Sequence, residues 1–314
     1  MTAHQTGEDT PAVTGSDELL APLPGGVELC YQTFGDPDDD PLLLIMGLGG
    51  PMIWWDTELC EDLAAAGFYV IRYDNRDCGR STRVGGRASI GLLVRAFLTG
   101  RAPAPYRMAD LAADALGLLD HLGLPAAHIA GVSMGGMIAQ TMAIETPERV
   151  LSLTSIMSTT GRRTVGRQHV TLLPLLIAPR RETRDDYVRT SLRVWRAIGS
   201  PGFAITEERL TERAHDTWDR GVASAGVVRQ MLAILTQPDR TDALREIDLP
   251  TLVVHGIEDK MVNASGGRAT ALAVRGAELL LVPGMGHDLP PALFATFVAG
   301  IRRTADRAAP AERS

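Results

Sequence analysis

Lysine is almost missing from this 314-residue chain: Lys260 is the only one, and arginine supplies the other basic side chains. The formal net charge is −7, so the chain has no basic surplus with which to neutralise phosphates. We therefore expect no nucleic-acid partner. The three cysteines, Cys30, Cys60 and Cys78, show neither a CxxC spacing nor a zinc-ligand spacing. They indicate reduced thiols in a cytoplasmic protein; a nucleophilic Cys78, in a loop, is the weaker alternative. No metal site is apparent in the sequence, and we expect no cofactor.

Long apolar runs are also missing. None approaches the roughly 20 residues that a membrane-spanning helix needs, so we expect no stable membrane insertion. The N-terminus has no basic start followed by an apolar stretch, which argues against a secretory signal. Residues 1–17 are polar and predict a disordered tail. The sequence does not indicate an oligomeric state.

What the chain does have is a regular alternation of short apolar runs with amphipathic ones. Apolar runs such as 41–47 and 127–133 predict buried strands, and the helical spacing of 107–123 is typical of their partners. This pattern predicts an α/β fold with a mostly parallel central sheet flanked by helices. Residues 160–247 lack strand patterns and predict a helical cap inserted between two strands. The expected parts are the tail (1–17), the core (18–159), the cap (160–247), the rest of the core (248–304) and a C-terminal tail (305–314).

Residues 83–107 interrupt the alternation a second time. Their centre, "SIGLLVRAFLTG", predicts a short amphipathic helix between flanks rich in glycine and proline. One interpretation is a helix packed against the core or the cap. The other is a flap that touches a lipophilic substrate or a membrane surface.

The run "GVSMG" places Ser133 between two glycines, after a predicted strand and before a predicted helix. This G-x-S-x-G context is the nucleophile elbow, a sharp turn that exposes the central side chain. The helix N-terminus adds backbone N–H groups and a positive dipole end close to the reacting oxygen. We therefore predict that Ser133 is a nucleophile rather than part of an ordinary tight turn.

A serine hydroxyl needs a base that is held in turn by an acid. His287 lies in a glycine-rich loop after the last predicted strand, where an open α/β sheet builds its site. The acid should follow an earlier strand, and "HGIEDKMV" offers Glu258 and Asp259; the position after the strand favours Asp259. Asp288 is expected to face solvent or to cap the final helix.

The tetrahedral intermediate of acyl transfer needs N–H donors for its oxyanion. The backbone N–H of Met134, directly after the nucleophile, should be one of them. The loop "MGLGG" after the first predicted strand should supply the other, from Leu48 or alternatively from Gly47. Trp54 and Trp55 follow this loop and could line the substrate entrance, with core packing as the alternative.

Three runs in this order, "GVSMGG", "HGIEDKMV" and "PGMGHDLP", resemble the α/β-hydrolase-fold enzymes. The resemblance covers residues 26–303 and is strongest to actinobacterial lipase-G-type esterases and lipases and to aclacinomycin methylesterases. It implies the α/β-hydrolase fold with its helical cap and a catalytic triad of serine, acid and histidine. "YDNRDCGRST" is similar to a segment that many members share, although Asp77 replaces its first glycine. Met46 stands where many members have a histidine before the oxyanion loop.

The sequence as a whole predicts a serine hydrolase that cleaves carboxylic esters of small, hydrophobic substrates through an acyl-enzyme. A polyketide methyl-esterase, a thioesterase or a cofactor-free perhydrolase would use the same three residues, and the pocket would decide between them. Epoxide hydrolases and dehalogenases of this family use an aspartate nucleophile, which Ser133 argues against. A non-catalytic ligand receptor on the same fold is the remote alternative.

Overall fold

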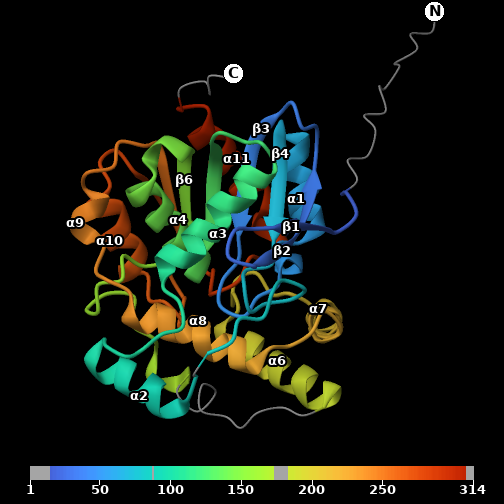
Figure 1. The fold of residues 1–314 in the computed structure, drawn as a ribbon, viewed down its shortest axis with the longest axis vertical. Helices are drawn as coiled ribbons and strands as arrows, with labels where there is room; N and C mark the ends of the chain where they lie inside the picture. Colours follow the sequence, from blue (N-terminus) through green and yellow to red (C-terminus); the bar gives the residue numbers. More distant parts are fainter. Residues whose placement is uncertain (1–14, 87, 173–182, 309–314) are drawn as a thin grey trace, which may run out of the picture.

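The computed structural model describes residues 15–86, 88–172 and 183–308. Its upper part is a sheet covered by helices, and its lower part is a group of helices beneath one end of that sheet (Figure 1). Residues 1–14 and 309–314, which hold most of the two predicted tails, lie outside the described residues. Ser16, predicted to belong to the first tail, instead donates its backbone N–H to Thr33 of the sheet.

The central sheet has eight strands in the order β1-β2-β4-β3-β5-β6-β7-β8. The pairs β1–β2 and β2–β4 are antiparallel, and all the other neighbours are parallel. The predicted mostly parallel sheet is confirmed. The strands are β1 (Leu19–Pro22), β2 (Glu28–Phe34), β3 (Asp40–Ile45), β4 (Phe68–Tyr73), β5 (Ala127–Val132), β6 (Val150–Ile156), β7 (Thr251–Gly256) and β8 (Glu278–Val282).

Helices connect these strands and cover both faces of the sheet. The α-helices are α1 (Thr57–Ala65), α2 (Ile90–Thr99), α3 (Met108–His121), α4 (Met134–Glu145), α6 (Arg184–Ile198), α7 (Glu207–Asp219), α8 (Ser224–Thr236), α9 (Thr241–Leu244), α10 (Ser265–Ala273) and α11 (Phe294–Ala305). Short 3-10 turns lie at Met52–Trp54, Pro147–Arg149, Val170–Leu172 and Pro291–Leu293.

The two faces of the sheet carry two separate hydrophobic cores. Leu43 and Ile45 of β3 pack with α3 and α4, whereas Leu42 and Leu44 pack with α1 and α11. Because successive side chains of a strand point to opposite faces, a strand covered on both sides must be apolar throughout. This is why β3 could be read from its uninterrupted apolar run.

The strands β1 and β2 were not predicted. β1 has four residues, three of them exposed, and β2 mixes Glu28 and Gln32 with its apolar residues. A strand that is covered only in part has no continuous apolar run, so its sequence looks like a loop. Their antiparallel pairing extends the sheet beyond the parallel part.

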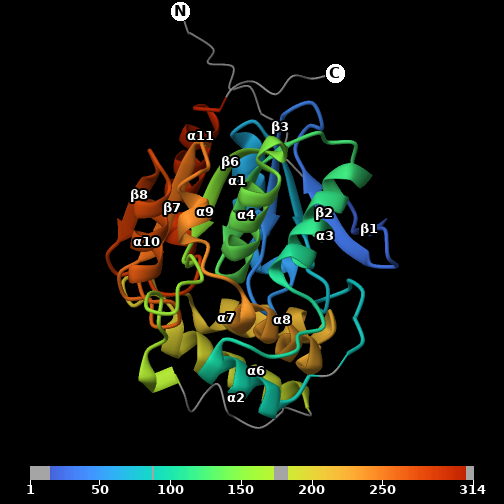
Figure 2. The same ribbon diagram turned by 60° about the vertical axis from the view of Figure 1, so that its left-hand side comes forward.

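The chain between β6 and β7 contains α6, α7 and α8 beneath the carboxyl ends of the parallel strands (Figure 2). We call residues 160–247 the insert, after the predicted cap. Its last helix, α9, does not join the other three: it packs against α10 and α4, and Leu244 belongs to the core on that face. The helical layer over the strand ends therefore stops at α8.

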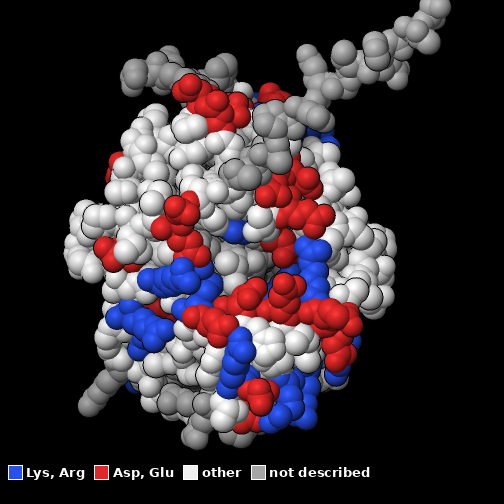
Figure 3. All heavy atoms as spheres, turned by 90° about the vertical axis from the view of Figure 1, so that its right-hand side faces the viewer, with Lys and Arg blue, Asp and Glu red and all other residues white. Residues whose placement is uncertain are grey.

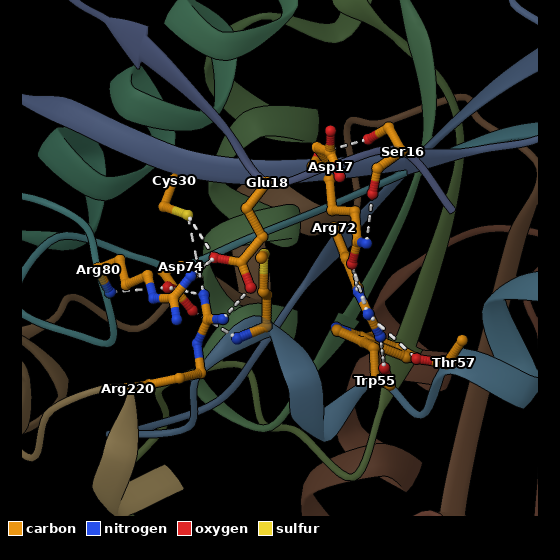
Figure 4. Close-up of polar contacts among 12 residues, drawn as sticks. Ser16, Asp17, Glu18, Cys30, Trp55, Thr57, Arg72, Asp74, Arg80 and Arg220 are labelled. Atoms are coloured by element: carbon orange, nitrogen blue, oxygen red, sulfur yellow. Dashed lines mark hydrogen bonds and ion pairs between the residues drawn. The ribbon is translucent and has the colours of Figure 1, made fainter. Parts of the chain in front are cut away.

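Charged side chains of both signs alternate where the insert meets the core (Figure 3). The most deeply buried pair joins Arg220, at the end of α7, to Asp74, after β4, with 2.6 Å between Nη2 and Oδ2. Arg220 also bonds Glu18, which accepts hydrogen bonds from Arg80 and from the Cys30 thiol (Figure 4). Burial opposes the charge of Arg220, but Asp74 and Glu18 outweigh it and raise the pKa of this guanidinium.

A second ion pair connects α8 to the same loop of the core. Arg229 donates two hydrogen bonds to the carboxylate of Asp77, at 2.8 and 2.6 Å, and the hydroxyl of Tyr106 donates a third at 2.7 Å. Asp77 has a positive φ of 68°, a conformation that favours glycine. Asp77 is the residue that departs from the family pattern. Its backbone strain is offset by the three hydrogen bonds that its carboxylate accepts from Arg229 in the insert and from Tyr106 in the chain that leads into α3.

We expect Arg220→Met to lower the free energy of unfolding by about 3 kcal/mol, because it leaves the fully buried Asp74 without its cation. Urea unfolding followed by circular dichroism measures the change. Arg184→Met is the matched control, since its pair with Asp219 is largely exposed and should be worth less than about 1 kcal/mol. Equal losses in the two variants would contradict the role of the Arg220–Asp74 pair.

Candidate active site

Ser133 occupies the turn between β5 and α4. Its φ of 57° and ψ of −115° lie outside the regions that side-chain-bearing residues ordinarily adopt. The turn is held from both sides: Ser133 donates its N–H to Ile156 in β6, and its carbonyl accepts from the Ser158 hydroxyl and from Met137. These hydrogen bonds thus stabilise a backbone conformation that is unfavourable for a residue with a side chain.

The two glycines around this serine are required by close backbone contacts. A Cβ atom on Gly131 would lie 2.2 Å from the carbonyl oxygen of Gly135, and one on Gly135 would lie 2.0 Å from that of Ile45. Both distances are far shorter than a carbon–oxygen contact allows. The elbow can close against β3 and α4 only because these positions carry no side chain.

The structure brings Ser133, His287 and Asp259 into one hydrogen-bonded chain. The Ser133 hydroxyl lies 3.1 Å from Nε2 of His287, and Nδ1 of the same ring lies 2.7 Å from Oδ2 of Asp259. The histidine comes from the loop after β8 and the aspartate from the loop after β7, although the three residues are far apart in the sequence. With Nδ1–H donating to the carboxylate, Nε2 is free to accept the serine proton.

Asp259 is buried and held as a carboxylate. Its Oδ1 accepts the backbone N–H groups of Met261 and Val262, each at 2.8 Å. Burial alone would raise its pKa, but the interactions with His287 and His255 outweigh burial and lower the pKa to about 2. The alternative acid, Glu258, points elsewhere and accepts the N–H of Gly284 at 2.6 Å.

His255 is a neighbour of the site that the sequence did not single out. Its Nε2 lies 2.7 Å from the carbonyl oxygen of Val262 and 3.4 Å from Oδ2 of Asp259. The ring belongs to β7 and is fully buried. Its contacts with Val262 and Asp259 therefore attach the loop that carries Asp259 to the sheet. A histidine inside a strand gave no signal of this contact in the sequence.

The loop after β3 passes directly beside Ser133. A turn from Gly47 to Gly50 is closed by the N–H of Gly50 on the Gly47 carbonyl at 3.2 Å, and Gly49 has a positive φ of 65°. Because a trans peptide directs its C=O and N–H groups to opposite sides, the Leu48 N–H points away from the inside of this turn. Gly47 and Leu48 both line the pocket next to Ser133.

One side chain of the insert forms a hydrogen bond with this turn. Gln230 of α8 accepts the Gly49 N–H at 2.8 Å and donates to the Arg76 carbonyl at 2.9 Å. From the core side, Asn75 donates to the Met46 carbonyl at 3.0 Å. Gln230 is fully buried. A polar residue among the apolar residues of α8 was the only sequence signal that this side chain has a buried hydrogen-bond partner.

The loop of His287 is also attached to the insert. Its backbone N–H donates to the carbonyl of Ile198 at the end of α6, and the Gly286 N–H donates to the Ser200 hydroxyl. Asp288 accepts the Ser200 N–H and hydroxyl and is only 6% exposed. The expectation that Asp288 faces solvent or caps the final helix is wrong, because its carboxylate fastens this loop to the insert.

A pocket of about 440 Å³ lies between the insert and the strand ends, with Ser133 and His287 in its wall. Trp54 lines it and packs edge-on against Trp195 of α6, with 5.1 Å between the ring centroids. Most of the other lining side chains are apolar and come from both parts of the molecule: Met46, Val132, Met137, Met157, Val194, Ile198, Val222, Met231, Ile234, Met261, Val262 and Leu289.

Trp55 does not take part in this pocket. Its side chain is fully buried in the core beside α1, and its carbonyl accepts a hydrogen bond from Arg72 (Figure 4). The prediction that it lines the entrance is therefore wrong, and the alternative of core packing holds. Neighbouring residues of an irregular segment point in different directions, which the sequence alone does not reveal.

The cysteines and the helix α2 lie outside this arrangement. Burial raises the pKa of the Cys78 thiol well above its usual value, which opposes a reactive thiolate. The described residues hold no group of three or more side chains suited to a metal ion. α2 packs against α8 and contributes no residue to the pocket wall, so it is not a lid over Ser133 in this structure.

The comparisons with known proteins assign the fold to a family. The pattern of the α/β hydrolase fold matches residues 40–290. The chain belongs to the α/β-hydrolase family. The predicted fold class is thereby confirmed. None of the helices in the described ranges has the length and hydrophobicity that crossing a membrane requires.

Individual relatives in this family are esterases. The chain is 29% identical to the rhodomycin D methylesterase DnrP of Streptomyces peucetius and 30% identical to the rhodomycin D methylesterase DauP of Streptomyces sp. (strain C5). Each match covers 88% of this chain and 94% of the relative. The enol-lactonase of Burkholderia xenovorans LB400 has the same fold, with a TM-score of 0.73, 21% identity, and coverage of 92% of this chain and 100% of the lactonase.

The structure provides a test between the two candidate acids. We expect Asp259→Asn to reduce kcat by about 10³- to 10⁴-fold, because an amide would hold the imidazole in the wrong tautomer. Glu258→Gln should change kcat less than about threefold, since this side chain binds only a loop N–H. Steady-state kinetics with p-nitrophenyl esters measures both, and a larger loss in Glu258→Gln would reverse the assignment.

Proposed function

We propose that this protein hydrolyses carboxylic esters of small, hydrophobic substrates through a covalent acyl-enzyme on Ser133. The observation that carries the proposal is the chain Ser133–His287–Asp259, with distances of 3.1 and 2.7 Å, in the wall of an apolar pocket. The esterase relatives support the same reaction class. A receptor would need no such chain of proton-transferring groups.

In the proposed mechanism, Nε2 of His287 takes the proton of the Ser133 hydroxyl as the oxygen attacks the ester carbonyl. Asp259, whose pKa is lowered by its interactions with His287 and His255, stabilises the imidazolium as a carboxylate. The N–H groups of Met134, at the start of α4, and of Leu48 bind the oxyanion. The imidazolium then protonates the leaving alkoxide, and a water that His287 activates releases the acid from the acyl-enzyme.

A methyl ester on a polyketide scaffold is the second candidate substrate class. The two Streptomyces relatives are named as rhodomycin D methylesterases and align over most of their length, which supports a methyl ester. The mixed lining of methionine, valine and tryptophan side chains suits a large apolar ligand, because methionine adapts its shape to irregular surfaces. Thioesterase and perhydrolase activities use the same three residues, so a panel of acyl-CoA, methyl ester and peracid assays distinguishes them.

We also propose that the helices α6, α7 and α8 of the predicted helical cap (160–247) serve as the roof of the substrate pocket and that the protein works in the cytoplasm. The lining residues of α6 and α8 support the first point. The second agrees with three cysteines that are all buried free thiols.

Ser133→Ala should abolish hydrolysis of short p-nitrophenyl esters, with a loss of more than about 10³-fold, while thermal unfolding stays close to that of the wild type. An organophosphate probe followed by mass spectrometry should add one adduct to the wild type at Ser133 and none to the variant. An unlabelled wild type would instead support the receptor alternative. Retained turnover in the alanine variant would refute the assigned nucleophile.

Gln230 should act as a positioning residue for the oxyanion donor at Leu48. We expect Gln230→Met to lower kcat by about tenfold with little change in KM, because the Gly49 N–H loses its acceptor and the turn relaxes. Gln140→Met is the matched control: Gln140 is an equally buried glutamine that bonds Ser155 and Arg240 away from the pocket. A proportional loss of stability and kcat in both variants would show that Gln230 is merely structural.

A further inference from the structure

The helix α2 presents an apolar face to solvent. Ile90, Val94, Phe97 and Leu98 are 77, 52, 57 and 70% exposed, and only Ala96 of this ten-residue helix is buried. The four exposed side chains follow the spacing i, i+4, i+7 and i+8, so they share one side of the helix. A soluble surface ordinarily scatters such residues, and a group of four on one helix indicates a contact surface.

This face lies at one end of the molecule. In both ribbon views α2 sits beyond α8, at the end of the molecule away from α11 (Figures 1 and 2). Its inner side packs against α8, whose Met231 and Ile234 line the active-site pocket. A surface bound by α2 would therefore be separated from the pocket wall by a single helix.

The sequence segment that carries the apolar face has charged side chains of one sign. Residues 83–107 contain five arginines and no acidic residue, in a chain whose net charge is −7. Arg95 and Arg101 are exposed and form no ion pair within the described ranges. Arg163 of the insert joins them: its guanidinium donates to the carbonyls of Ala96 and Phe97 at the end of α2. An anionic partner would find three cations beside the apolar residues.

We propose that the outer face of α2 is a reversible docking surface for an anionic phospholipid bilayer. Exposed Phe, Leu, Ile and Val side chains enter the boundary between headgroups and acyl chains, while the arginines remain at the phosphate level. Because no part of the helix needs to cross the bilayer, the contact is peripheral. It places the pocket of a hydrolase for hydrophobic substrates next to the phase in which such substrates concentrate.

A second copy of the chain fits this face less well. A stable dimer buries about 20–30 residues on each side, whereas α2 offers four exposed apolar side chains on ten residues. Two copies related by a twofold axis would also bring the arginine groups of both α2 segments together, and like charges repel. A bilayer supplies the opposite charge and adapts its shape to the helix.

Flotation of the full-length protein with phospholipid vesicles tests the proposal directly. We expect the wild type to float with vesicles that contain phosphatidylglycerol and to remain in the bottom fraction with phosphatidylcholine alone. Raising the salt concentration from about 0.05 to 0.5 M should reduce the vesicle-bound fraction by about tenfold, because salt screens the attraction between the arginines and the lipid phosphates. Binding does not depend on catalysis, so the Ser133→Ala variant should float as well as the wild type.

Two double variants separate the apolar and the charged contributions. Phe97→Ser with Leu98→Ser should reduce partitioning by more than about tenfold. Arg95→Gln with Arg101→Gln should abolish the preference for phosphatidylglycerol. The matched control is Leu272→Ser with Arg275→Gln: Leu272 of α10 is 86% exposed, Arg275 follows the end of that helix, and neither belongs to α2, so this variant should float normally.

Three results would overturn the proposal. One is a wild type that stays unbound with both vesicle types. Another is flotation that the Phe97/Leu98 variant retains in full. The third is a dimer in light scattering that this variant converts to a monomer while neither protein binds vesicles, which would assign the face to a second copy of the chain.

Discussion

The backbone of Ser133 is the constraint on which the rest of the site depends. Ser133 is held at a φ of 57° because β5 must turn into α4 within a single residue. A Cβ atom on Gly131 or on Gly135 would lie only 2.2 or 2.0 Å from a backbone carbonyl oxygen, so neither position has room for a side chain. The elbow fixes the Ser133 hydroxyl oxygen at the carboxyl end of β5, in the middle of the sheet. Every other group, from His287 to the turn at Leu48, is useful only in relation to that position.

The insert does more than cover this position. Through Gln230 it holds the turn that carries the proposed oxyanion donor, Leu48, and through Ser200 and the carbonyl of Ile198 it holds the loop that carries His287. Both contacts use polar groups that are buried, where an unpaired partner would cost free energy. The geometry of the site and the shape of the pocket above it are thus coupled through the same helices, α6 and α8.

Asp77 shows how a local departure from the family pattern can be accommodated. Its positive φ would suit the glycine that it replaces, yet its carboxylate binds Arg229 and Tyr106 and so anchors α8 and the chain leading into α3. The same helix carries Gln230 one residue later. The ion pair therefore secures the helix that binds the turn from Gly47 to Gly50, and the strain at Asp77 is compensated by tertiary contacts that only the folded chain provides.

Local patterns were enough to predict the parallel strands, the elbow at Ser133 and the chain order of serine, acid and histidine, because each depends on periodicity or on residues close in sequence. The antiparallel strands β1 and β2, the packing of α9 on the core and the different directions of Trp54 and Trp55 were decided by tertiary packing. So were the distance of 2.7 Å that selects Asp259 over Glu258, and the buried partners of Gln230 and Asp288. The physical reason is that a hydrogen bond between distant segments leaves no period and no spacing in the sequence; it exists only once the sheet and the insert have brought its two atoms together.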